Sequence, residues 1–459
     1  MVFASFVFLF WFLPLFLPLY FAVPVRWRNL ALTFGSIAFY GWWRPQYVLL
    51  MLLSITFDWW AGLRMGEPGS GRSRKAWLLF SLVTNLGLLG WFKYANLLVG
   101  TWNDLAPWPI EWENVLLPVG ISFFTFQSMS YTIDVYRGDV KPERSLLDLV
   151  CFVSMFPQLV AGPIVRYSEV RASLHERRVD LRSFSDGVFL FAFGLAKKVL
   201  IADSIGPLVD AVYAGDNPGF VAAWAAAFGY SLQIYFDFSG YSDMAVGLGR
   251  MLGFAFPSNF LSPYRASSIT ELWRRWHVSL STWLRDYLYV PLGGNRLGEA
   301  RAQWNVAITM LLGGLWHGAS WTYLLWGAWH GVFLVFERRL GKRSPYAALP
   351  LFVQVAVTFL IWTLGLVIFR SLTMRELVDI AGGLVGKNGL GALPDLGQLH
   401  VPAVVAMLVG AGIVFALPRA EQMVARGRPL VLLLSLLLLL LATCQLLTHD
   451  FVSFIYYQF

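Results

Sequence analysis

The sequence predicts an all-α, polytopic integral membrane protein. Of its 459 residues, 57% are hydrophobic and only 14% are charged, which is far more apolar than a soluble globular domain. Apolar stretches of roughly 17–25 residues, each long enough to cross a bilayer as a helix, recur along the whole chain. The basic residues gather in short loops between these stretches. Together these observations favour transmembrane helices over any soluble fold class.

The apolar stretches predict about eleven transmembrane helices, because a bilayer-spanning helix needs roughly 20 residues. They lie near residues 3–22, 29–62 (two helices), 77–98, 114–133, 147–165, 188–213, 219–236, 304–336 (one or two), 350–370, 401–417 and 429–447. No polar stretch is long enough to bury a core of its own, so residues 1–459 are expected to form a single membrane-embedded domain.

The net charge of +8 indicates membrane orientation rather than nucleic-acid binding. The basic residues cluster in short loops near residues 26–28, 64–75, 166–182, 338–343 and 419–428. By the positive-inside rule these loops are cytoplasmic, which places both termini outside. The two cysteines, Cys151 and Cys444, lie in apolar stretches and disfavour a disulfide framework or a cysteine metal site. We expect the protein to bind no metal or cofactor and to be surrounded by the lipid bilayer.

The stretch from Ser267 to Arg301 is too polar to span a bilayer and too aromatic for an ordinary loop. Its large apolar side chains recur at three- and four-residue spacings, which predicts one amphipathic helix that lies in the interface or enters the membrane as a re-entrant element. This stripe consists of Trp273, Trp276, Leu280, Trp283, Leu284 and Tyr287. Arg274, Ser281 and Arg285 flank the stripe, and His277 lies at its boundary.

The ends of this amphipathic helix are also predictable. Residues Ser267 to Thr270 offer hydroxyl groups as N-caps, and Glu271 falls in the first turn, where the helix dipole favours a carboxylate. The helix is expected to end near Pro291, before Gly293 and Gly294.

His317 is the only side chain between Ile308 and Trp326 that titrates near neutral pH. An ionisable group inside an apolar segment is costly, so it indicates a functional site, and histidine exchanges protons near neutral pH. Gly313, Gly314 and Gly318 would let another helix or a ligand approach the backbone closely. The alternative is a structural histidine that donates one hydrogen bond and accepts another.

Two other histidines are possible partners of His317. The amphipathic helix could bring His277 to it, although His277 could instead be an interfacial histidine beside lipid or tryptophan. On a continuous helix His330 would lie about 20 Å from His317 and on nearly the opposite face. The two could share one site only across a helix break, so we expect His330 to be structural.

Two polar clusters in apolar regions supply further candidate channel residues. Asp237 and Asp243 flank a Ser-Gly-Tyr sequence that is expected to break the helix, and could bind a cation, orient a histidine or bind only backbone amides. In residues 156–166 two prolines interrupt a helix before Arg166, giving either a cavity-lining segment or a plain kink. The candidate substrate-channel residues are Asp237, Asp243, Trp316, Arg274, Ser281, Gln158 and Arg166.

Several common catalytic motifs are absent from the sequence. It contains no P-loop, no Gly-x-Gly-x-x-Gly fingerprint, no Gly-x-Ser-x-Gly elbow and no His-Glu-x-x-His pair. Chemistry driven by ATP, nicotinamide, a serine nucleophile or protease-type zinc is therefore unsupported. Proton transfer centred on a histidine inside the membrane is what the residues favour.

Several long strings resemble the membrane-bound O-acyltransferase family. They are Met1–Ser5, Phe92–Asn96, Leu117–Ser122, Ile133–Gly138, Tyr235–Met244, Trp273–Tyr289 and Gly314–Gly318, so the resemblance covers most of the chain. Within the family, these strings resemble the bacterial members that act in alginate O-acetylation. The resemblance implies that His317 is the catalytic histidine and His277 a second histidine near the pore. Gln158 departs from the pattern, because similar proteins often carry a histidine there.

The resemblance implies an O-acetyltransferase in the bacterial inner membrane. Such proteins take an acyl group from a cytoplasmic thioester, here acetyl-CoA as donor substrate, and pass it outward for O-acetylation of an exported polysaccharide, with alginate as the expected polymer. An extracytoplasmic acetyltransferase and the polysaccharide-export machinery are the implied partners. His317 would act as a general base or as a nucleophile that carries the acyl group.

Two other functions remain open from the residues alone. In a proton-coupled secondary transporter or flippase, His317, His277 and Asp237 would form a proton relay. In a scaffold for a polymer-export complex, the histidines would be purely structural.

Overall fold

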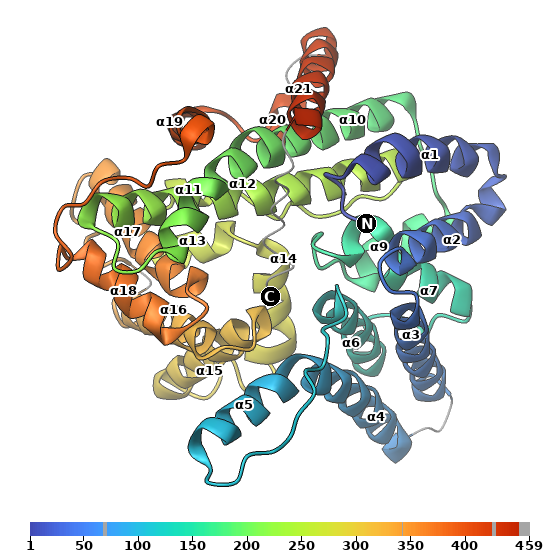
Figure 1. The fold of residues 1–459 in the computed structure, drawn as a ribbon. Coiled ribbons are helices and arrows are strands. Elements are labelled where there is room, and N and C mark those ends of the chain that lie inside the picture. Colours follow the sequence, from blue (N-terminus) through green and yellow to red (C-terminus); the bar gives the residue numbers. More distant parts are fainter. Residues whose placement is uncertain (68–70, 342, 425–427, 449–459) are drawn as a thin grey trace. The chain divides into compact units, whose positions relative to one another are not determined.

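The computed structural model describes residues 1–67, 71–341, 343–424 and 428–448, and over these residues the chain forms helices and connecting loops without any strand (Figure 1). This confirms the predicted all-α class. Parts of three basic loops, at residues 68–70, 342 and 425–427, lie outside the described residues. The chain divides into two compact units, unit 1 with Met1–Phe191 and Met244–Pro257, and unit 2 with Ala192–Asp243 and Ser258–Phe459.

Four helical stretches of the described chain are long and apolar enough to cross a membrane. They are Gln46–Met65, Ser73–Leu105, Leu351–Arg370 and Gly397–Ala416. The expected count of about eleven spans is therefore not confirmed by length and apolarity. Helices that are surrounded by protein can carry polar side chains, which lowers their apolarity. In α6 (Ile121–Arg137), for example, Thr125, Gln127 and Ser130 are fully buried.

Unit 1 is built from short and medium helices in the N-terminal part of the chain. They are η1 (Phe8–Phe12), α1 (Leu13–Ala22), η2 (Val25–Trp27), α2 (Arg28–Gly41), α3 (Gln46–Met65), α4 (Gly71–Leu89), η3 (Gly90–Tyr94), α5 (Ala95–Leu105), α6 (Ile121–Arg137), α7 (Leu146–Ser154), α8 (Phe156–Leu159) and α9 (Tyr167–His175). The helices α10 (Leu181–Ala196) and α12 (Phe220–Leu252) have residues in both units.

A buried polar network joins three helices of unit 1. The Asp58 carboxylate on α3 accepts hydrogen bonds from Ser81 Oγ at 2.6 Å and from Asn85 Nδ2 at 2.8 Å, both on α4. Ser81 is also hydrogen-bonded to Thr132 on α6 at 2.9 Å. The helices α3, α4 and α6 pack side by side around this network (Figure 1). Satisfied polar groups thus fix their register, since a buried polar group without a partner is costly.

Unit 2 carries the remaining helices and an aromatic core. The helices are η4 (Lys197–Ala202), α11 (Asp203–Ala214), η5 (Pro263–Arg265), α13 (Ile269–Arg275), α14 (Val278–Leu284), η6 (Arg285–Tyr289), α15 (Glu299–His317), α16 (Trp321–Arg339), α17 (Leu351–Arg370), α18 (Met374–Leu384), η7 (Gly397–Leu399), α19 (His400–Ala416), α20 (Ala420–Val424) and α21 (Arg428–Thr448). Trp326 and Trp362 are among the largest side chains that are fully buried.

The expected helix break between Asp237 and Asp243 is wrong, because α12 continues through both residues. A Cβ atom at Gly240 would lie only 2.6 Å from the carbonyl oxygen of Gly194 on α10. Gly240 therefore does not form a turn. Its lack of a side chain lets α12 pack closely against α10.

The single amphipathic helix expected after Ser267 is also wrong in its extent. Ser268 caps α13 as expected, since its Oγ accepts a hydrogen bond from Glu271 N at 3.1 Å. The chain then leaves the helix at Trp276 and His277 and resumes it as α14. The predicted stripe is largely buried in protein, with Trp276, Leu280, Trp283, Leu284 and Tyr287 all in the core.

The apolar run from Ile308 to Trp326 is two helices, which form a hairpin. Helix α15 ends at His317, and α16 begins at Trp321 after a short loop. The two helices pack closely side by side (Figure 1). A Cβ atom at Gly314 would lie 2.3 Å from Tyr323 O, and one at Gly327 would lie 2.5 Å from Met310 O. Gly314, near His317, therefore lets α16 approach the backbone of α15 closely, as predicted.

Replacing Gly314 should destabilise this hairpin. We expect Gly314→Ala to lower the free energy of unfolding by about 1–3 kcal/mol, because the added methyl group overlaps a backbone carbonyl that cannot rotate away. Thermal unfolding of the purified protein in detergent measures the effect. Gly87→Ala is the matched control, since a Cβ atom at Gly87 in α4 meets nothing within 4 Å and the change should be neutral or stabilising. Equal losses in both variants would contradict the packing argument.

Candidate active site

His317 is the last residue of α15, where the chain turns into the loop before α16. Its side chain is almost completely shielded, with 6% of the residue exposed. The ring centroids of Trp316, Trp326 and Phe369 lie 5.0, 5.1 and 5.3 Å from that of the imidazole. Rings from α15, α16 and α17 thus enclose this histidine and largely exclude water from it.

His277 connects α13 and α14 in a left-handed backbone conformation, with φ 43° and ψ 55°. This conformation is uncommon for a residue with a side chain, costs about 1–3 kcal/mol, and is found preferentially at functional sites. The residue is fully buried, and the Phe238 ring packs edge-on at 4.6 Å between centroids. Among the described residues, neither ring nitrogen of His277 has a hydrogen-bond partner.

The break at His277 is stabilised from a distant part of the chain. Asn259 accepts hydrogen bonds at its carbonyl oxygen from Val278 N at 3.0 Å and at Oδ1 from Ser279 N at 3.1 Å. Asn259 therefore caps α14, a role that the residue before a helix commonly fills with its own side chain. The imidazole of His277 is left available for other contacts.

The preceding helix, α13, is anchored by a buried carboxylate. Glu337 on α16 accepts hydrogen bonds from Ile269 N and Thr270 N, both at 2.8 Å. In the same turn, burial alone would raise the pKa of Glu271, but hydrogen bonds from Ser267 and the neighbouring Arg275 outweigh burial and lower it. The Glu337 carboxylate thus satisfies two free N–H groups of the first turn of α13. These contacts hold α13, and with it the His277 break, against the α15–α16 hairpin.

The structure brings the two predicted catalytic histidines into one buried site. The ring centroids of His277 and His317 are 6.4 Å apart, and the Trp316 ring lies 6.0 Å from His277. Two imidazoles at this separation can exchange a proton through one substrate atom or one water molecule. Their catalytic roles remain predictions.

His330 lies on α16, one aromatic ring away from His317. The Trp326 centroid is 5.1 Å from the His317 ring and 5.0 Å from the His330 ring. Trp273 and Trp362 pack against His330 at 5.4 and 5.0 Å. The expected separation of about 20 Å assumed a continuous helix, which the hairpin replaces. A structural role for His330 remains a prediction.

Both candidate aspartates of α12 form ion pairs with lysines of η4. Asp237 lies 2.9 Å from Lys198 Nζ, which also contacts Asp203, and all three residues are buried. Asp243 lies 2.7 Å from Lys197 Nζ. These lysine partners of the two aspartates were not predicted from the sequence. Lys198 could have been found, because a charged residue in the apolar stretch 188–213 requires a partner.

The other candidate channel residues have separate environments. Trp316 contacts both histidine rings, whereas Arg274 is exposed on α13 and Ser281 Oγ donates to Trp276 O at 3.3 Å. Gln158 and Arg166 belong to unit 1. Gln158 is fully buried and donates to Phe152 O, and the backbone N–H of Arg166 donates to Glu169 Oε2 at 2.8 Å.

Similarity to known proteins establishes the family to which this chain belongs. A family model described as "MBOAT, membrane-bound O-acyltransferase family" matches residues 140–375, a range that contains His277, His317 and His330. The chain belongs to the membrane-bound O-acyltransferase family. The sequence resemblance is thereby confirmed, and the protein is an O-acyltransferase of the membrane.

This O-acyltransferase is similar to known bacterial proteins over most of its length. It is 49% identical over 377 residues, 81% of the chain and 72% of the relative, to the "Probable alginate O-acetylase AlgI" of Pseudomonas aeruginosa. The protein of the same name from Azotobacter vinelandii is 45% identical over 436 residues, 93% of the chain and 86% of the relative. The "Peptidoglycan O-acetyltransferase" of Helicobacter pylori is 35% identical over 419 residues, 84% of the chain and 80% of the relative.

Several residues that build the site of this O-acyltransferase carried no signal in the sequence. These residues act through contacts with segments far from them in the chain. They are Asn259, Trp362, Phe369 and Glu337. Periodicity and local motifs report neighbours along one helix, so they do not reveal which distant residue caps a helix or covers a ring.

Proposed function

We propose that this O-acyltransferase moves an acetyl group from cytoplasmic acetyl-CoA across the bacterial inner membrane for O-acetylation of exported alginate. The observation that carries the chemistry is the buried pair of His277 and His317, with ring centroids 6.4 Å apart. The names of the relatives from Pseudomonas aeruginosa and Azotobacter vinelandii support alginate as the polymer. Membership of the family favours this function over the transporter and scaffold alternatives.

His317 would supply the base in this reaction. Its neutral imidazole takes the proton of an acceptor hydroxyl as the hydroxyl oxygen attacks the thioester carbonyl carbon. The carbon–sulfur bond then breaks, and the imidazolium returns the proton to the leaving CoA thiolate. The C-terminal end of α15 carries the negative end of the helix dipole, which stabilises the imidazolium formed on the way. General base catalysis of this kind is worth about 10²–10⁴-fold in rate.

His277 would act as the second group of the pair. Because neither of its ring nitrogens has a hydrogen-bond partner among the described residues, an N–H of this imidazole is available to the carbonyl oxygen of the thioester. A donor placed at this oxygen stabilises the negative charge that develops as the hydroxyl attacks. The surrounding rings exclude water, which limits hydrolysis of the thioester.

A covalent route uses the same residues. A ring nitrogen of neutral His317 would attack the thioester carbonyl carbon, the carbon–sulfur bond would break, and the acylated ring would give its N–H proton to the leaving CoA thiolate. The acceptor hydroxyl would then attack the acetyl carbon, and the released imidazole would take the hydroxyl proton. In either route, the acceptor is the polysaccharide or an extracytoplasmic acetyltransferase that hands the group to the polysaccharide, with the export machinery beside it. Both routes require an unprotonated His317 at the start.

The acceptor polymer can be tested in cells. We expect a bacterial strain that makes unacetylated alginate to gain acetate esters on alginate when it expresses this chain with its partner proteins, and its peptidoglycan to stay unchanged. Nuclear magnetic resonance of both isolated polymers measures the esters. Esters on peptidoglycan alone would redirect the proposal to that polymer. No ester on either polymer, with the protein present in the membrane fraction, would refute it.

A further inference from the structure

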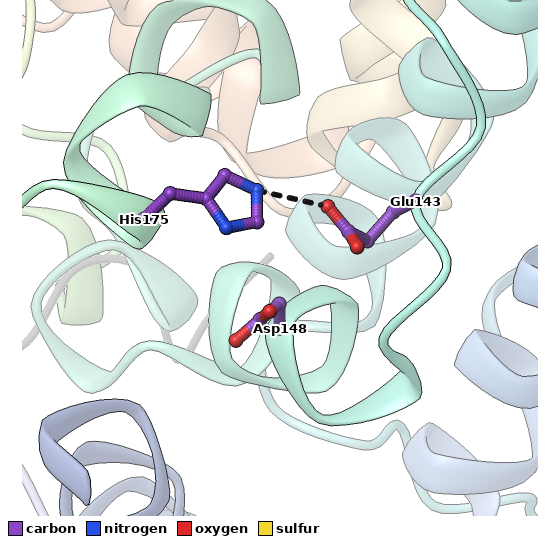
Figure 2. Close-up of side chains that lie close together, drawn as sticks. All are labelled: Glu143, Asp148 and His175. Atoms are coloured by element: carbon purple, nitrogen blue, oxygen red, sulfur yellow. Dashed lines mark hydrogen bonds and ion pairs between the residues drawn. The ribbon is translucent and has the colours of Figure 1, made fainter. Parts of the chain in front are cut away.

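A cluster of metal-ligating side chains lies in unit 1 and shares no residue with the histidine pair of unit 2. Glu143 precedes α7, Asp148 lies in the first turn of α7, and His175 is the last residue of α9. One possible ligand atom of each residue lies within 4.8 Å of the other two. Figure 2 shows the imidazole and the Glu143 carboxylate facing each other, with Asp148 beside them. Two chain segments, the start of α7 and the end of α9, thus converge on one point.

The two carboxylates are oriented by further residues. Glu143 is buried, and it accepts hydrogen bonds from the Tyr167 hydroxyl and from Ser145 N at 2.9 Å. Asn29 Nδ2 donates to Asp148 Oδ1 at 2.5 Å. Hydrogen bonds of this kind fix the direction of ligand oxygens in metal sites, and they are part of what sets metal affinity. The ligand atoms are therefore held in place before any ion binds.

The charges of the cluster leave room for a divalent cation. His175 Nε2 lies 3.2 Å from Glu143 Oε2, but this contact involves only one of the two carboxylates. Neighbouring carboxylates repel each other unless a cation lies between them. Arg177, a cationic side chain that contacts Asn29, donates its hydrogen bonds to Asn29 Oδ1 and to the Tyr20 hydroxyl rather than to either carboxylate. A doubly charged ion would balance Glu143 and Asp148 and take the lone pair of a neutral imidazole.

We propose that Glu143, Asp148 and His175 bind a divalent transition-metal ion, with Zn²⁺ as the best fit. Imidazole nitrogen and carboxylate oxygen are both zinc ligands, and three of them with one water complete a four-coordinate site, whereas Ca²⁺ prefers six to eight oxygen ligands. The side chain of His175 is partly exposed, so water can fill the fourth position. The ion would fasten the end of α9 to the start of α7 and thereby stabilise this part of unit 1.

Direct metal binding tests the site. The full-length protein, purified in detergent without a polyhistidine tag and freed of metal with a chelator, is titrated with Zn²⁺ alone by calorimetry. We expect one equivalent to bind and the unfolding temperature to rise. His175→Ala and Asp148→Asn should each weaken binding at least 10-fold, because each removes one of three ligands. Glu143 is left intact, since it also holds Tyr167 and Ser145.

A matched control and a second readout separate this site from surface binding. His400→Ala removes a histidine at the start of α19, outside the cluster, and should bind Zn²⁺ like the unmodified protein. Co²⁺ bound at the cluster should give visible absorption bands that His175→Ala abolishes. Unchanged Zn²⁺ affinity in both His175→Ala and Asp148→Asn would overturn the proposal. So would the absence of bound Zn²⁺ and of any rise in unfolding temperature in the unmodified protein.

Discussion

Replacing His317 by alanine is expected to abolish acetyl transfer while the protein still folds and inserts. Alanine keeps the end of α15 helical but removes the imidazole that would accept the hydroxyl proton. We expect the release of free CoA from acetyl-CoA, measured with a thiol reagent on purified protein supplied with its acceptor, to fall by about 10²–10⁴-fold. In cells, acetate esters on alginate should disappear.

His330→Ala is the matched control for His317→Ala. Both side chains are buried histidines that touch Trp326, so loss of packing affects both variants in a similar way. We expect His330→Ala to lower thermal stability and to retain transfer. Fully acetylated alginate from cells that carry only His317→Ala would refute the proposed base. Radiolabel from acetyl-CoA that stays on denatured wild-type protein, but not on His317→Ala, would favour the covalent route.

Replacing His277 by asparagine should reduce turnover strongly with little change in stability. Asparagine tolerates the left-handed backbone at this position, and the cap of α14 comes from Asn259 rather than from His277. The loss of turnover therefore measures the contribution of the imidazole alone. We expect kcat to fall by about 10²–10³-fold, as it does when one hydrogen-bond donor to a developing oxyanion is removed. The same CoA-release assay measures it.

Two further substitutions at His277 separate backbone from side chain. Glycine adopts the left-handed conformation freely, whereas in alanine this conformation costs about 1–2 kcal/mol. His277→Gly should therefore match His277→Asn in turnover, and His277→Ala should show the same low turnover with an additional loss of thermal stability. Wild-type kcat in His277→Asn would show that the imidazole takes no part in the reaction and that the residue only shapes the chain.

Much of the local structure was predictable from the residues. The apolar composition required helices, because a bilayer leaves backbone groups no other partners. The hydroxyl cap at Ser268 and the carboxylate of Glu271 in the first turn follow from chemistry within a few positions of each residue. His317 stood out for the same reason, as a titratable group in an apolar run.

The predictions that failed depended on contacts between distant segments. The glycine of the Ser-Gly-Tyr sequence in α12 packs against α10 instead of forming a turn. The aromatic stripe after Ser267 has helical spacing on both sides of His277, so its periodicity conceals a break that Asn259 stabilises from outside. The spacing of apolar residues along the chain predicts which side chains are buried. It does not predict which groups form hydrogen bonds with the backbone.

The sequence by itself determined that this chain is helical, lies in a membrane and carries a histidine suited to proton transfer. The tertiary structure decided that α15 ends at His317, that the chain breaks at His277, and that the two imidazoles meet in one buried aromatic site. The physical reason is that composition and periodicity act locally. The two breaks, by contrast, are held by Asn259, Glu337 and the glycine contacts of the hairpin, which exist only once separate helices have packed together.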